Sequence, residues 1–450
     1  MCGVFGVYNN KEAANLAYMG LYAQQHRGQE SAGIVSSDGE VLYRHAGHGL
    51  VSEVFKDKDS FAGLRGNNAI GHVRYSTAGD NGINNIGPLW NYDSGMHKII
   101  GEYYNKRQKI AVSHNGNLTN VPATSYTDTK FIINRLERIN NLKDKESIER
   151  VFKSFEGSYA LLALMGEKMI AARDPNGIRP LCMGILGDSY VFASETCALD
   201  LVGATYVRDV DPGEIIVLDA GTMTSFSIRD KVNKKHCIFE YVYFARPDSK
   251  VFGQNVSETR KKMGKILAEE SPCPDVDIVM SVPDSSNIQA LRFADETNKK
   301  FEFGLIRNHY IGRTFIYPNQ RLRDTSVKLK FNVDTSVVKG QRVAVIDDSI
   351  VRGTTLRKLT KLLKEAGAKE VHLRSSSPPV KYPCFYGMDF PTKDELVANK
   401  KSIQETKREL GAESLEYLSL KGLLKAAGGN KSDYCTACFN GCYIEEKGDK

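Results

Sequence analysis

The second residue of the chain is a cysteine, and its position could give it a base of its own. Removal of Met1 would leave a free α-amino group on Cys2, and such an amine titrates near about 7.7–8.0, so it can accept a proton at neutral pH. A terminal amine is one way to activate a side-chain nucleophile, and a thiol is a better nucleophile than a hydroxyl. A cysteine here is also compatible with the start of an ordinary strand, so this chemistry needs support from other residues.

A second set of reactive residues lies in segment 343–355, where Asp347 and Asp348 stand between an apolar run and a turn with hydroxyl and glycine residues. The apolar run predicts a buried strand, and the residues after the turn predict a helix over 356–366. Ligands of open α/β sheets bind at the carboxyl ends of strands, where backbone N–H groups can hold a phosphate. Carboxylates beside such a cradle suit a sugar phosphate, because they can face ribose hydroxyls and stabilise positive charge at the anomeric carbon. The spacing is not that of a Walker loop.

The cysteines suggest a third kind of chemistry. Their number, nine, is odd, and in a reducing compartment this points to metal binding or catalysis more than to disulfides. Cys435 and Cys438 have the spacing of two ligands of one metal centre, and Cys442 follows four residues later. Thiolates suit zinc or an iron–sulfur cluster, and spacing alone leaves both open.

Bulk composition narrows the class of protein. The chain has 450 residues, of which 41% are hydrophobic and 26% charged, and its net charge is +7. Such a length predicts about two to three domains. The basic residues form no face with interleaved aromatics, which argues against nucleic acid as a partner. There is no charged-then-apolar leader and no apolar run of about 18 residues, so we expect a cytoplasmic protein without a membrane segment.

The elements that must position these groups change character along the chain. Short strand-like segments with interleaved helices, such as 12–25, fill the first half. A polar, basic stretch over 229–236 is the predicted linker. Beyond it, buried strands alternate with helices, which predicts a parallel sheet with helices on its faces. Residues 414–427 are predicted to form a C-terminal helix before the cysteine-rich tail.

Segment 343–355 resembles the signature of type I phosphoribosyltransferases, and together with Cys2 it makes nearly the whole chain similar to the amidophosphoribosyltransferase family. The resemblance implies an α+β, N-terminal nucleophile (αββα) class II glutaminase domain over 1–232. It further implies an α/β type I phosphoribosyltransferase domain over 233–450 that ends in a helical, cysteine-rich tail. The implied reaction joins glutamine, 5-phosphoribosyl 1-pyrophosphate (PRPP) and water to give phosphoribosylamine, glutamate and pyrophosphate at the start of purine synthesis. Ammonia would pass internally between the two sites.

The resemblance also implies roles for residues of the first half. Cys2 would attack the glutamine amide, with Asn115 and Gly116 as the oxyanion hole. Arg74 would pair with the carboxylate of glutamine, for which a planar two-pronged donor is well suited. Asp128 would receive the glutamine ammonium, and Arg27 would support the site. Lys130 departs from the family, which usually has Glu at this position.

In the second half, the resemblance assigns a magnesium ion to Ser285, Asp347 and Asp348. Mg²⁺ prefers oxygen ligands, commonly one or two carboxylates with substrate phosphates and water. Segment 321–333 matches a loop that orders over bound substrate, with Lys328 where Arg is common. The expected PRPP contacts are Asp347, Asp348, Ser349, Arg352, Gly353, Thr354 and Thr355.

The iron–sulfur branch of the family implies a four-iron, four-sulfur (4Fe–4S) cluster. Its expected ligands are Cys237, Cys384, Cys435 and Cys438. Cys442 falls at a variable position and would be a bystander. A zinc site on Cys435, Cys438 and Cys442 is the competing interpretation.

The family also suggests partners and rivals. Its members are commonly tetrameric and inhibited by purine nucleotides, so we expect a homo-oligomer, tetramer or dimer, with purine nucleotides as inhibitors. Other class II amidotransferases, such as hexosamine-phosphate synthase or asparagine synthetase, would lack the loop at Asp347, Asp348 and Ser349. A non-catalytic PRPP sensor would have lost the nucleophile or the acid pair, and both are intact.

Overall fold

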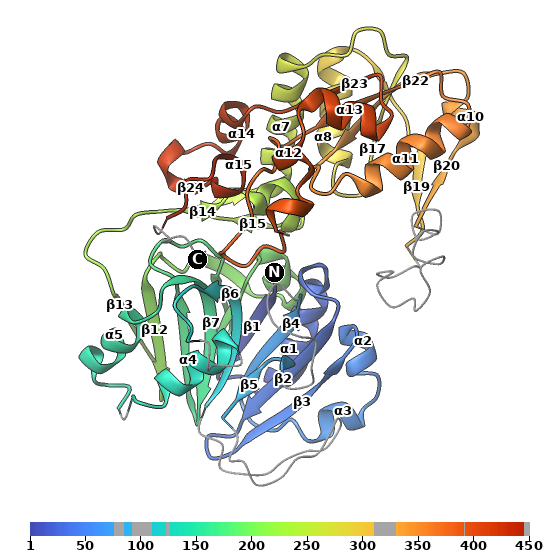
Figure 1. Ribbon diagram of the computed structural model, residues 1–450. Helices are drawn as coiled ribbons and strands as arrows, with labels where there is room; N and C mark the ends of the chain where they lie inside the picture. Colours follow the sequence, from blue (N-terminus) through green and yellow to red (C-terminus); the bar gives the residue numbers. More distant parts are fainter. Residues whose placement is uncertain are drawn as a thin grey trace.

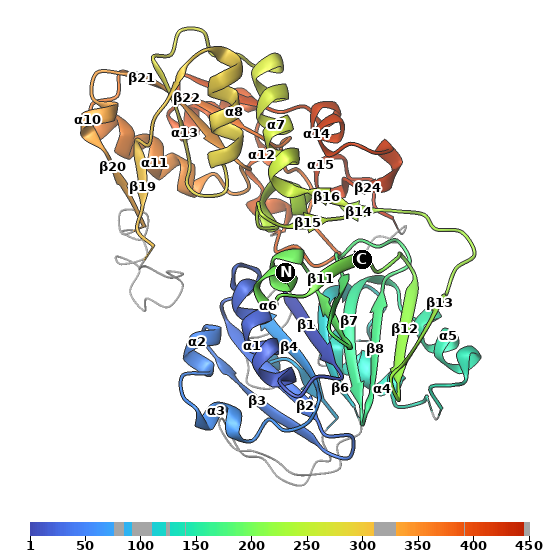
Figure 2. The same ribbon diagram turned by 180° about the vertical axis from the view of Figure 1, so that it is seen from behind.

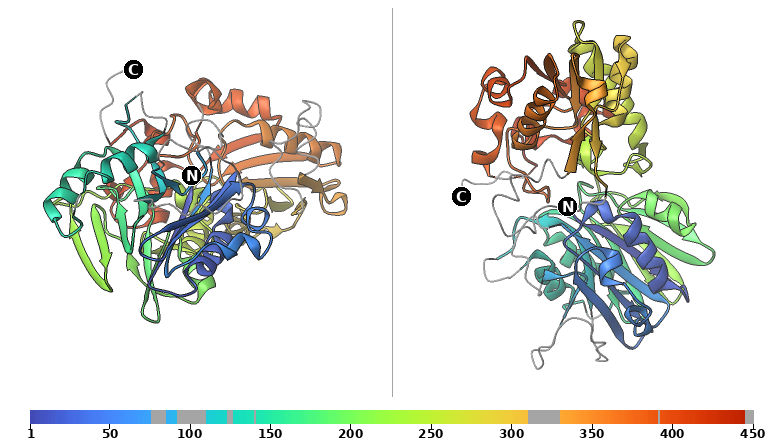
Figure 3. Two further views of the ribbon diagram at one scale, coloured as in Figure 1. Left: turned by 90° about the horizontal axis from the view of Figure 1, so that it is seen from below. Right: turned by 90° about the vertical axis from the view of Figure 1, so that its right-hand side faces the viewer.

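The two halves of the sequence form two stacked bodies, and the N-terminus lies where they meet (Figure 1). The computed structural model describes residues 1–75, 85–91, 110–122, 127–139, 141–309, 330–390 and 392–444. The first half builds the lower body of Figure 1 and the second half the upper one, and Figure 3 gives the same arrangement from below and from the side.

Strands of the first half pair into two antiparallel sheets among the described residues. The seven-stranded sheet has the order β11-β9-β10-β1-β4-β2-β3. Its strands are β1 (Gly3–Tyr8), β2 (Ser31–Ser37), β3 (Leu42–His48), β4 (Asn68–Arg74), β9 (Cys182–Leu186), β10 (Ser189–Ala193) and β11 (Thr205–Asp209). The six-stranded sheet has the order β13-β12-β8-β7-β6-β5. Its strands are β5 (Leu89–Trp90), β6 (Ala111–Leu118), β7 (Gly157–Met165), β8 (Lys168–Arg173), β12 (Glu214–Asp219) and β13 (Thr222–Ser227).

Helices cover the outer faces of both sheets, which gives the four layers of the predicted αββα fold. Helices α1 (Ala13–Ala23) and α6 (Thr196–Val202) pack on the seven-stranded sheet, and α4 (Asp128–Leu136) and α5 (Lys145–Lys153) on the six-stranded sheet. The short helices α2 (Val51–Val54) and α3 (Asp59–Ala62) and the 3-10 turn η1 (Gln25–Arg27) complete this body.

The sequence of β1 shows why it lies in the centre. Successive side chains of a strand point to opposite faces. Val4 and Tyr8 accordingly enter the core between the two sheets, whereas Phe5 and Val7 enter the core under α1. β1 is buried on both faces and is apolar throughout. Because Cys2 directly precedes β1, the position of this strand places Cys2 at the upper end of both sheets.

The second half contains the predicted parallel sheet, with the order β18-β17-β21-β22-β23. Its strands are β17 (Ile278–Ser281), β18 (Lys300–Phe301), β21 (Arg342–Asp347), β22 (Glu370–Ser375) and β23 (Ser414–Tyr417). Helices α7 (Val256–Glu270) and α8 (Asn287–Thr297) pack on one face, and α11 (Thr354–Glu365) and α13 (Ile403–Leu410) on the other.

Smaller elements complete this body. They are β14 (His236–Cys237), the π-helical turn η3 (Glu240–Phe244), β15 (Lys250–Val251), β16 (Gln254–Asn255), β19 (Leu305–Arg307), β20 (Phe331–Val333), α10 (Thr335–Val338), η5 (Lys393–Glu395), α12 (Val397–Lys400), α14 (Leu420–Ala427), η6 (Lys431–Asp433), β24 (Tyr434–Cys435) and α15 (Ala437–Asn440).

The helix predicted over 414–427 is wrong in its first part. Ser414–Tyr417 is strand β23, which pairs in parallel with β22, and helix α14 begins only at Leu420. Leu415 is buried and Glu416 exposed, the alternation of an edge strand. Ser419 then caps the helix, because its side chain accepts a hydrogen bond from the backbone N–H of Gly422 at 2.8 Å.

The chain passes from the first body to the second near the predicted linker. Residues 228–235, which join β13 to β14, run along the outside of the molecule (Figure 2). Among the described residues, no helix combines the length and apolar character that a membrane crossing needs.

Candidate functional site

Cys2 lies immediately before β1, between the two sheets of the first body. Its backbone N–H donates to Asn115 Oδ1 at 3.1 Å, and its Sγ lies 3.7 Å from the carbonyl oxygen of Tyr75. The first contact comes from β6 of the six-stranded sheet and the second from the residue after β4 of the seven-stranded sheet. The thiol is half-buried, so a small molecule can reach it.

Asn115 and Gly116 stand beside Cys2 and offer hydrogen-bond donors. Asn115 is fully buried, and although Cys2 uses its Oδ1, its Nδ2 has no hydrogen-bond partner among the described residues. A Cβ on Gly116 would lie 2.1 Å from the carbonyl oxygen of Ser158, so no larger residue fits. A buried donor without an acceptor costs about 1–3 kcal/mol, and an oxygen atom of a ligand would remove that cost.

Asp128 opens helix α4 and faces His114 of β6. Thr127 caps the helix, because its side-chain oxygen accepts a hydrogen bond from the backbone N–H of Lys130 at 3.1 Å. This bond uses only the backbone of Lys130, so the lysine side chain does not disturb the cap beside Asp128. Asp128 Oδ2 lies 3.5 Å from His114 Nδ1. Burial alone would raise the pKa of Asp128, but the nearby His114 holds that pKa below its ordinary value. In return, Asp128 raises the pKa of His114 although burial opposes it.

Arg74 ends β4, close to the segment that follows α1. Its side chain is largely buried, and Nη1 donates to the carbonyl oxygen of Asn85 at 2.7 Å. A Cβ on Gly28 would lie 2.5 Å from backbone atoms of Arg74, so this glycine lets the two segments touch. The backbone that carries the Arg74 guanidinium is therefore fixed by this close approach.

Arg27, in turn η1, is fully buried and is hydrogen-bonded to the backbone of Cys2. Its Nε donates to the carbonyl oxygen of Cys2 at 3.0 Å. Its terminal nitrogens donate to the carboxylate of Glu240 at 3.0 and 2.9 Å, and Nη1 also contacts Glu195. Burial opposes the charge of Arg27, but the two carboxylates raise its pKa.

Met1 packs into the core of the second body. Its side chain is 2% exposed and its sulfur contacts Arg179. Burial lowers the pKa of its α-amino group to about 5. While Met1 is present, the nitrogen of Cys2 is a peptide N–H and cannot act as a base, so the predicted amine exists only after Met1 has been removed.

Asp347 ends β21 and Asp348 follows it, at the carboxyl edge of the parallel sheet. Asp348 accepts hydrogen bonds from Ser285 at 2.5 Å and from Ser349 at 2.6 Å. Burial and the neighbouring Asp348 raise the pKa of Asp347 well above its ordinary value. Burial also raises the pKa of Asp348, and the serine hydroxyls offset part of that rise. Two buried, crowded carboxylates of this kind favour a cation.

The turn after these carboxylates has the backbone of a helix cap. Gly353 adopts φ +72°, which favours glycine, and α11 begins at Thr354. Thr354 and Thr355 are exposed. Arg352, however, donates from Nε to Glu395 at 2.9 Å. The structure therefore brings together Ser285, Asp347, Asp348 and Ser349, whereas Arg352 is held by η5. Residues 321–329 of the predicted substrate loop lie outside the described residues.

Four cysteines from distant parts of the second half line one cavity. Cys237 and Cys435 are paired neighbours in the two-stranded sheet of β14 and β24. Cys384 and Cys438 line the same cavity, which encloses about 330 Å³ of empty space, part of it open to solvent. Burial and the nearness of the other sulfurs raise the pKa of Cys237 to about 11 and that of Cys435 to about 12.

Cys442 is exposed and does not line this cavity. Among the residues the structure describes, no group of three His, Cys, Asp or Glu side chains stands where it could hold a metal ion. Cys442 therefore lies apart from Cys435 and Cys438, with which it would have to share a zinc ion.

Sequence reasoning missed three residues that touch the site. His114 lies inside a recognised motif, and its distance from Asp128 could not be inferred from its position. Glu195 and Glu240 approach Arg27 from positions 168 and 213 residues away, and no local pattern marks either of them.

Comparisons with known proteins agree with the two halves. Residues 72–201 match the glutamine amidotransferase domain family, and residues 277–376 match the phosphoribosyl transferase domain family. The amidophosphoribosyltransferase of Bacillus subtilis (strain 168) is 44% identical over 461 residues, which cover 99% of this chain and 94% of that protein. That of Archaeoglobus fulgidus is 44% identical over 467 residues, covering 98% of each chain.

Two solved structures are similar over the full length. One, described as the allosteric regulatory enzyme of purine biosynthesis, has a TM-score of 0.89 at 43% identity and covers 99% of this chain and 96% of its own. The other is the glutamine PRPP amidotransferase from B. subtilis complexed with ADP and GMP. It has a TM-score of 0.87 at 43% identity, with coverage of 99% and 98%.

Proposed function

The chain belongs to the amidophosphoribosyltransferase family and catalyses the glutamine-dependent amination of PRPP in purine biosynthesis, and we propose that Cys2 is the nucleophile that releases the nitrogen. The observation that carries this assignment is the unpartnered amide nitrogen of Asn115, buried beside the thiol. A tetrahedral intermediate on Cys2 would place its oxyanion within reach of that donor and of the N–H of Gly116. One such donor is worth about 2.7–4 kcal/mol of barrier.

Once Met1 has been removed, the amine of Cys2 can take the thiol proton. The amine would keep its contact with Asn115 Oδ1, because that bond uses the nitrogen of Cys2. The same group can then pass the proton to the departing ammonia. Arg27 fixes the carbonyl end of the same residue, so both ends of Cys2 are anchored.

Glutamine recognition is proposed for Arg74 and Asp128. Their charges are opposite, and they stand at the end of β4 and at the start of α4. Arg74 suits the α-carboxylate of glutamine and Asp128 its ammonium. The ionised state of Asp128, which the lowered pKa ensures at neutral pH, supports that pairing.

PRPP binding is proposed for the turn at the carboxyl edge of β21, with the ribose facing Asp347 and Asp348. The remaining contacts would be Ser349, Arg352, Gly353, Thr354 and Thr355, and Arg352 would have to leave Glu395 to take part. The crowded carboxylates and the hydroxyl of Ser285 fit Mg²⁺, which uses one or two carboxylates with substrate phosphates. A bound Mg²⁺ would neutralise charge on the leaving pyrophosphate.

A 4Fe–4S cluster is proposed for Cys237, Cys384, Cys435 and Cys438. Their convergence on one cavity supports it. The raised pKa values of the thiols mean that cluster binding would release protons. Such a cluster would supply a rigid link between three chain segments, those of Cys237, of Cys384 and of Cys435 with Cys438.

Further proposals concern organisation and regulation. We propose domains over 1–232 and 233–450, ammonia passage between the two sites, and a homo-oligomer, tetramer or dimer, in the cytoplasm. The B. subtilis structure with ADP and GMP supports purine nucleotides as ligands, and we expect them to inhibit this enzyme. All nine cysteines are free.

Replacing the nucleophile tests the division of labour. In Cys2→Ala, glutamine-dependent formation of phosphoribosylamine should vanish, because no thiol is left to attack the amide. Activity with an added ammonium salt should persist, because the phosphoribosyl site is untouched. Cys442→Ala, an exposed cysteine, is the matched control and should keep both activities. Loss of both activities in Cys2→Ala, or of neither, would contradict the assignment.

A further inference from the structure

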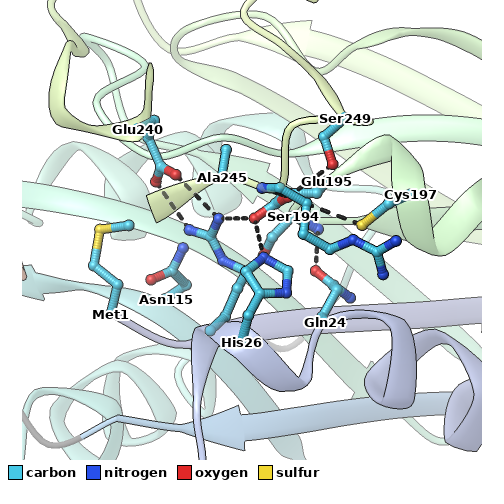
Figure 4. Close-up of polar contacts among 12 residues, drawn as sticks. Met1, Gln24, His26, Asn115, Ser194, Glu195, Cys197, Glu240, Ala245 and Ser249 are labelled. Carbon is cyan, nitrogen blue, oxygen red and sulfur yellow. Dashed lines mark hydrogen bonds and ion pairs between the residues drawn. The ribbon is translucent and has the colours of Figure 1, made fainter. Parts of the chain in front are cut away.

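A carboxylate from the second half of the chain reaches into the glutaminase half. Glu240 lies in η3 and is fully buried, and it accepts two hydrogen bonds from the guanidinium of Arg27 (Figure 4). The two bonds are nearly equal in length, 3.0 and 2.9 Å. A carboxylate held by both terminal nitrogens fixes the plane of the guanidinium.

The third nitrogen of that guanidinium points at the nucleophile residue. Arg27 Nε donates to the carbonyl oxygen of Cys2 at 3.0 Å, so the plane that Glu240 fixes also sets the position of Cys2. We propose that Glu240 is a positioning residue for glutamine cleavage, which acts through Arg27 on the backbone of Cys2. The glutaminase site is then complete only when the second half of the chain is docked on the first. This proposal rests on the assignment of Cys2 as the nucleophile.

Glu240 is well anchored on its own side. The N–H of Ala245 donates to the carbonyl oxygen of Glu240 at 3.0 Å, which closes the π-helical turn. Arg260 of α7 donates to the carbonyl oxygens of Tyr241 and Ala245, both at 2.9 Å. Arg260 is buried, and its charge lowers the pKa of Asp348 against the effect of burial. The turn that carries Glu240 is therefore held in place by a buried residue of α7.

Glu195, the other carboxylate that contacts Arg27, has several further hydrogen-bond partners. It contacts Nη1 only, and it also binds His26 at 2.8 Å, Ser249 at 2.7 Å and the N–H of Arg246 at 2.9 Å. Glu195 thus ties several segments together, whereas Glu240 makes its side-chain hydrogen bonds with Arg27 and forms an ion pair with Arg179 at 3.9 Å among the described residues. Glu240 is the carboxylate that binds both terminal nitrogens of Arg27, so it defines the plane of the guanidinium.

The variant Glu240→Gln tests this role, because an amide keeps the size of the side chain but has one acceptor oxygen instead of two. A small misplacement of a reacting group can cost about 100-fold in rate, and we expect the glutamine-dependent kcat to fall about 10- to 100-fold. The KM for glutamine should change less than threefold or so, because Arg74 and Asp128 still bind the substrate. Activity with ammonium should remain. The rate at which a glutamine-like chloroketone alkylates Cys2 should fall in parallel with kcat.

A matched control is available in the same body. Arg208 and Glu214 form an equivalent two-bond pair at 2.7 Å, away from Cys2, so Glu214→Gln should leave the ratio of glutamine to ammonium activity unchanged. If Glu240→Gln keeps full glutamine activity, or loses both activities together, the proposal is overturned. If Glu240→Gln fails to fold, Glu240→Asp decides in its place. That variant keeps the charge on a shorter arm, and unchanged glutamine activity in it would overturn the proposal.

Failure of the underlying assignment gives a different result. If Cys2 were not the nucleophile, Cys2→Ala would keep glutamine activity in the otherwise unchanged protein, whatever Glu240→Gln does. If Cys2→Ala loses glutamine activity and Glu240→Gln keeps all of it, only the positioning role of Glu240 is rejected.

Discussion

The charges of individual side chains in the glutaminase site are set by their neighbours, and the pair Asp128 and His114 shows the consequence. The raised pKa of His114 means that the ring stays protonated to a higher pH than an ordinary histidine. Protonated His114 is a partner for the same carboxylate that we propose for the glutamine ammonium. The pair is fully formed below the ordinary pKa of about 6.5 and is lost as the pH rises through the raised value.

This competition predicts a pH-dependent KM for glutamine. As the pH falls below the pKa of His114, the fraction of free Asp128 falls, and KM should rise by up to about tenfold per pH unit. His114→Asn, which cannot be protonated, should flatten this dependence. The measurement is glutamine hydrolysis at fixed enzyme concentration between about pH 6 and pH 9. An equally steep KM profile in His114→Asn would show that another group is responsible.

Single residues were predictable where short motifs carry them. Cys2, Asp347 and Asp348 can be singled out from neighbouring residues, because a chain start and a strand end are local features, whereas Asn115 was expected from the family resemblance. The partners of Arg27 were not, because the chain returns to it only after the whole first half has folded. Long-range ion pairs leave no periodic signal in a sequence.

A buried strand that is followed by a helix with a defined start was also predictable. The strand and helix around Asp347 appear as β21 and α11, because an apolar run and a glycine at positive φ suffice to define them. Residues 414–417 were misassigned to a helix, because pairing with β22 decides their conformation. The π-helical turn η3 was not foreseen, since it depends on Arg260 binding its carbonyl groups.

Close contact between α7 and α8 gives a prediction at this scale. A Cβ on Gly264 would lie 2.3 Å from the carbonyl oxygen of Gln289, a backbone atom that cannot rotate away. Gly264→Ala should therefore force the helices apart at a cost of about 1–3 kcal/mol, against a gain in helix propensity of about 1 kcal/mol. The net effect should be a lower midpoint of thermal unfolding.

The same shift should weaken PRPP binding, because α8 begins just after Ser285. The KM for PRPP with ammonium as nitrogen source is the readout. Lys265→Ala, at the exposed next position of α7, is the control and should change stability by less than about 0.5 kcal/mol. A Gly264→Ala protein as stable as the wild type would show that the two helices are free to separate.

On the scale of the whole molecule, the cysteine cavity adjoins the contact between the two bodies. The residues after Cys384 offer their carbonyl oxygens to the first body: that of Phe385 accepts from Asn117 and that of Tyr386 from Ser158, both at 2.9 Å. Asn117 follows Gly116 in the chain and pairs with Ser158 across the sheet. A group bound by the four cysteines would therefore steady the segment that lies over the proposed oxyanion site.

Chemical analysis tests the cluster and this link. Protein purified without oxygen should contain iron and acid-labile sulfide in equal amounts and no stoichiometric zinc. Cys384→Ser should lose the iron and some glutamine activity, because the loop would loosen, whereas Cys442→Ser should keep both. Stoichiometric zinc that depends on Cys442 would reject the 4Fe–4S assignment.

The buried first methionine has a consequence for how the enzyme matures in the cell. An aminopeptidase cuts only a chain end that it can grasp, and the folded protein encloses Met1 among side chains of the opposite body. Trimming must accordingly take place on the nascent polypeptide, before its later half has been made and has closed over it. A molecule that kept Met1 would fold but would lack the glutaminase activity proposed for Cys2. The yield of folded protein would then be higher than the yield of active enzyme.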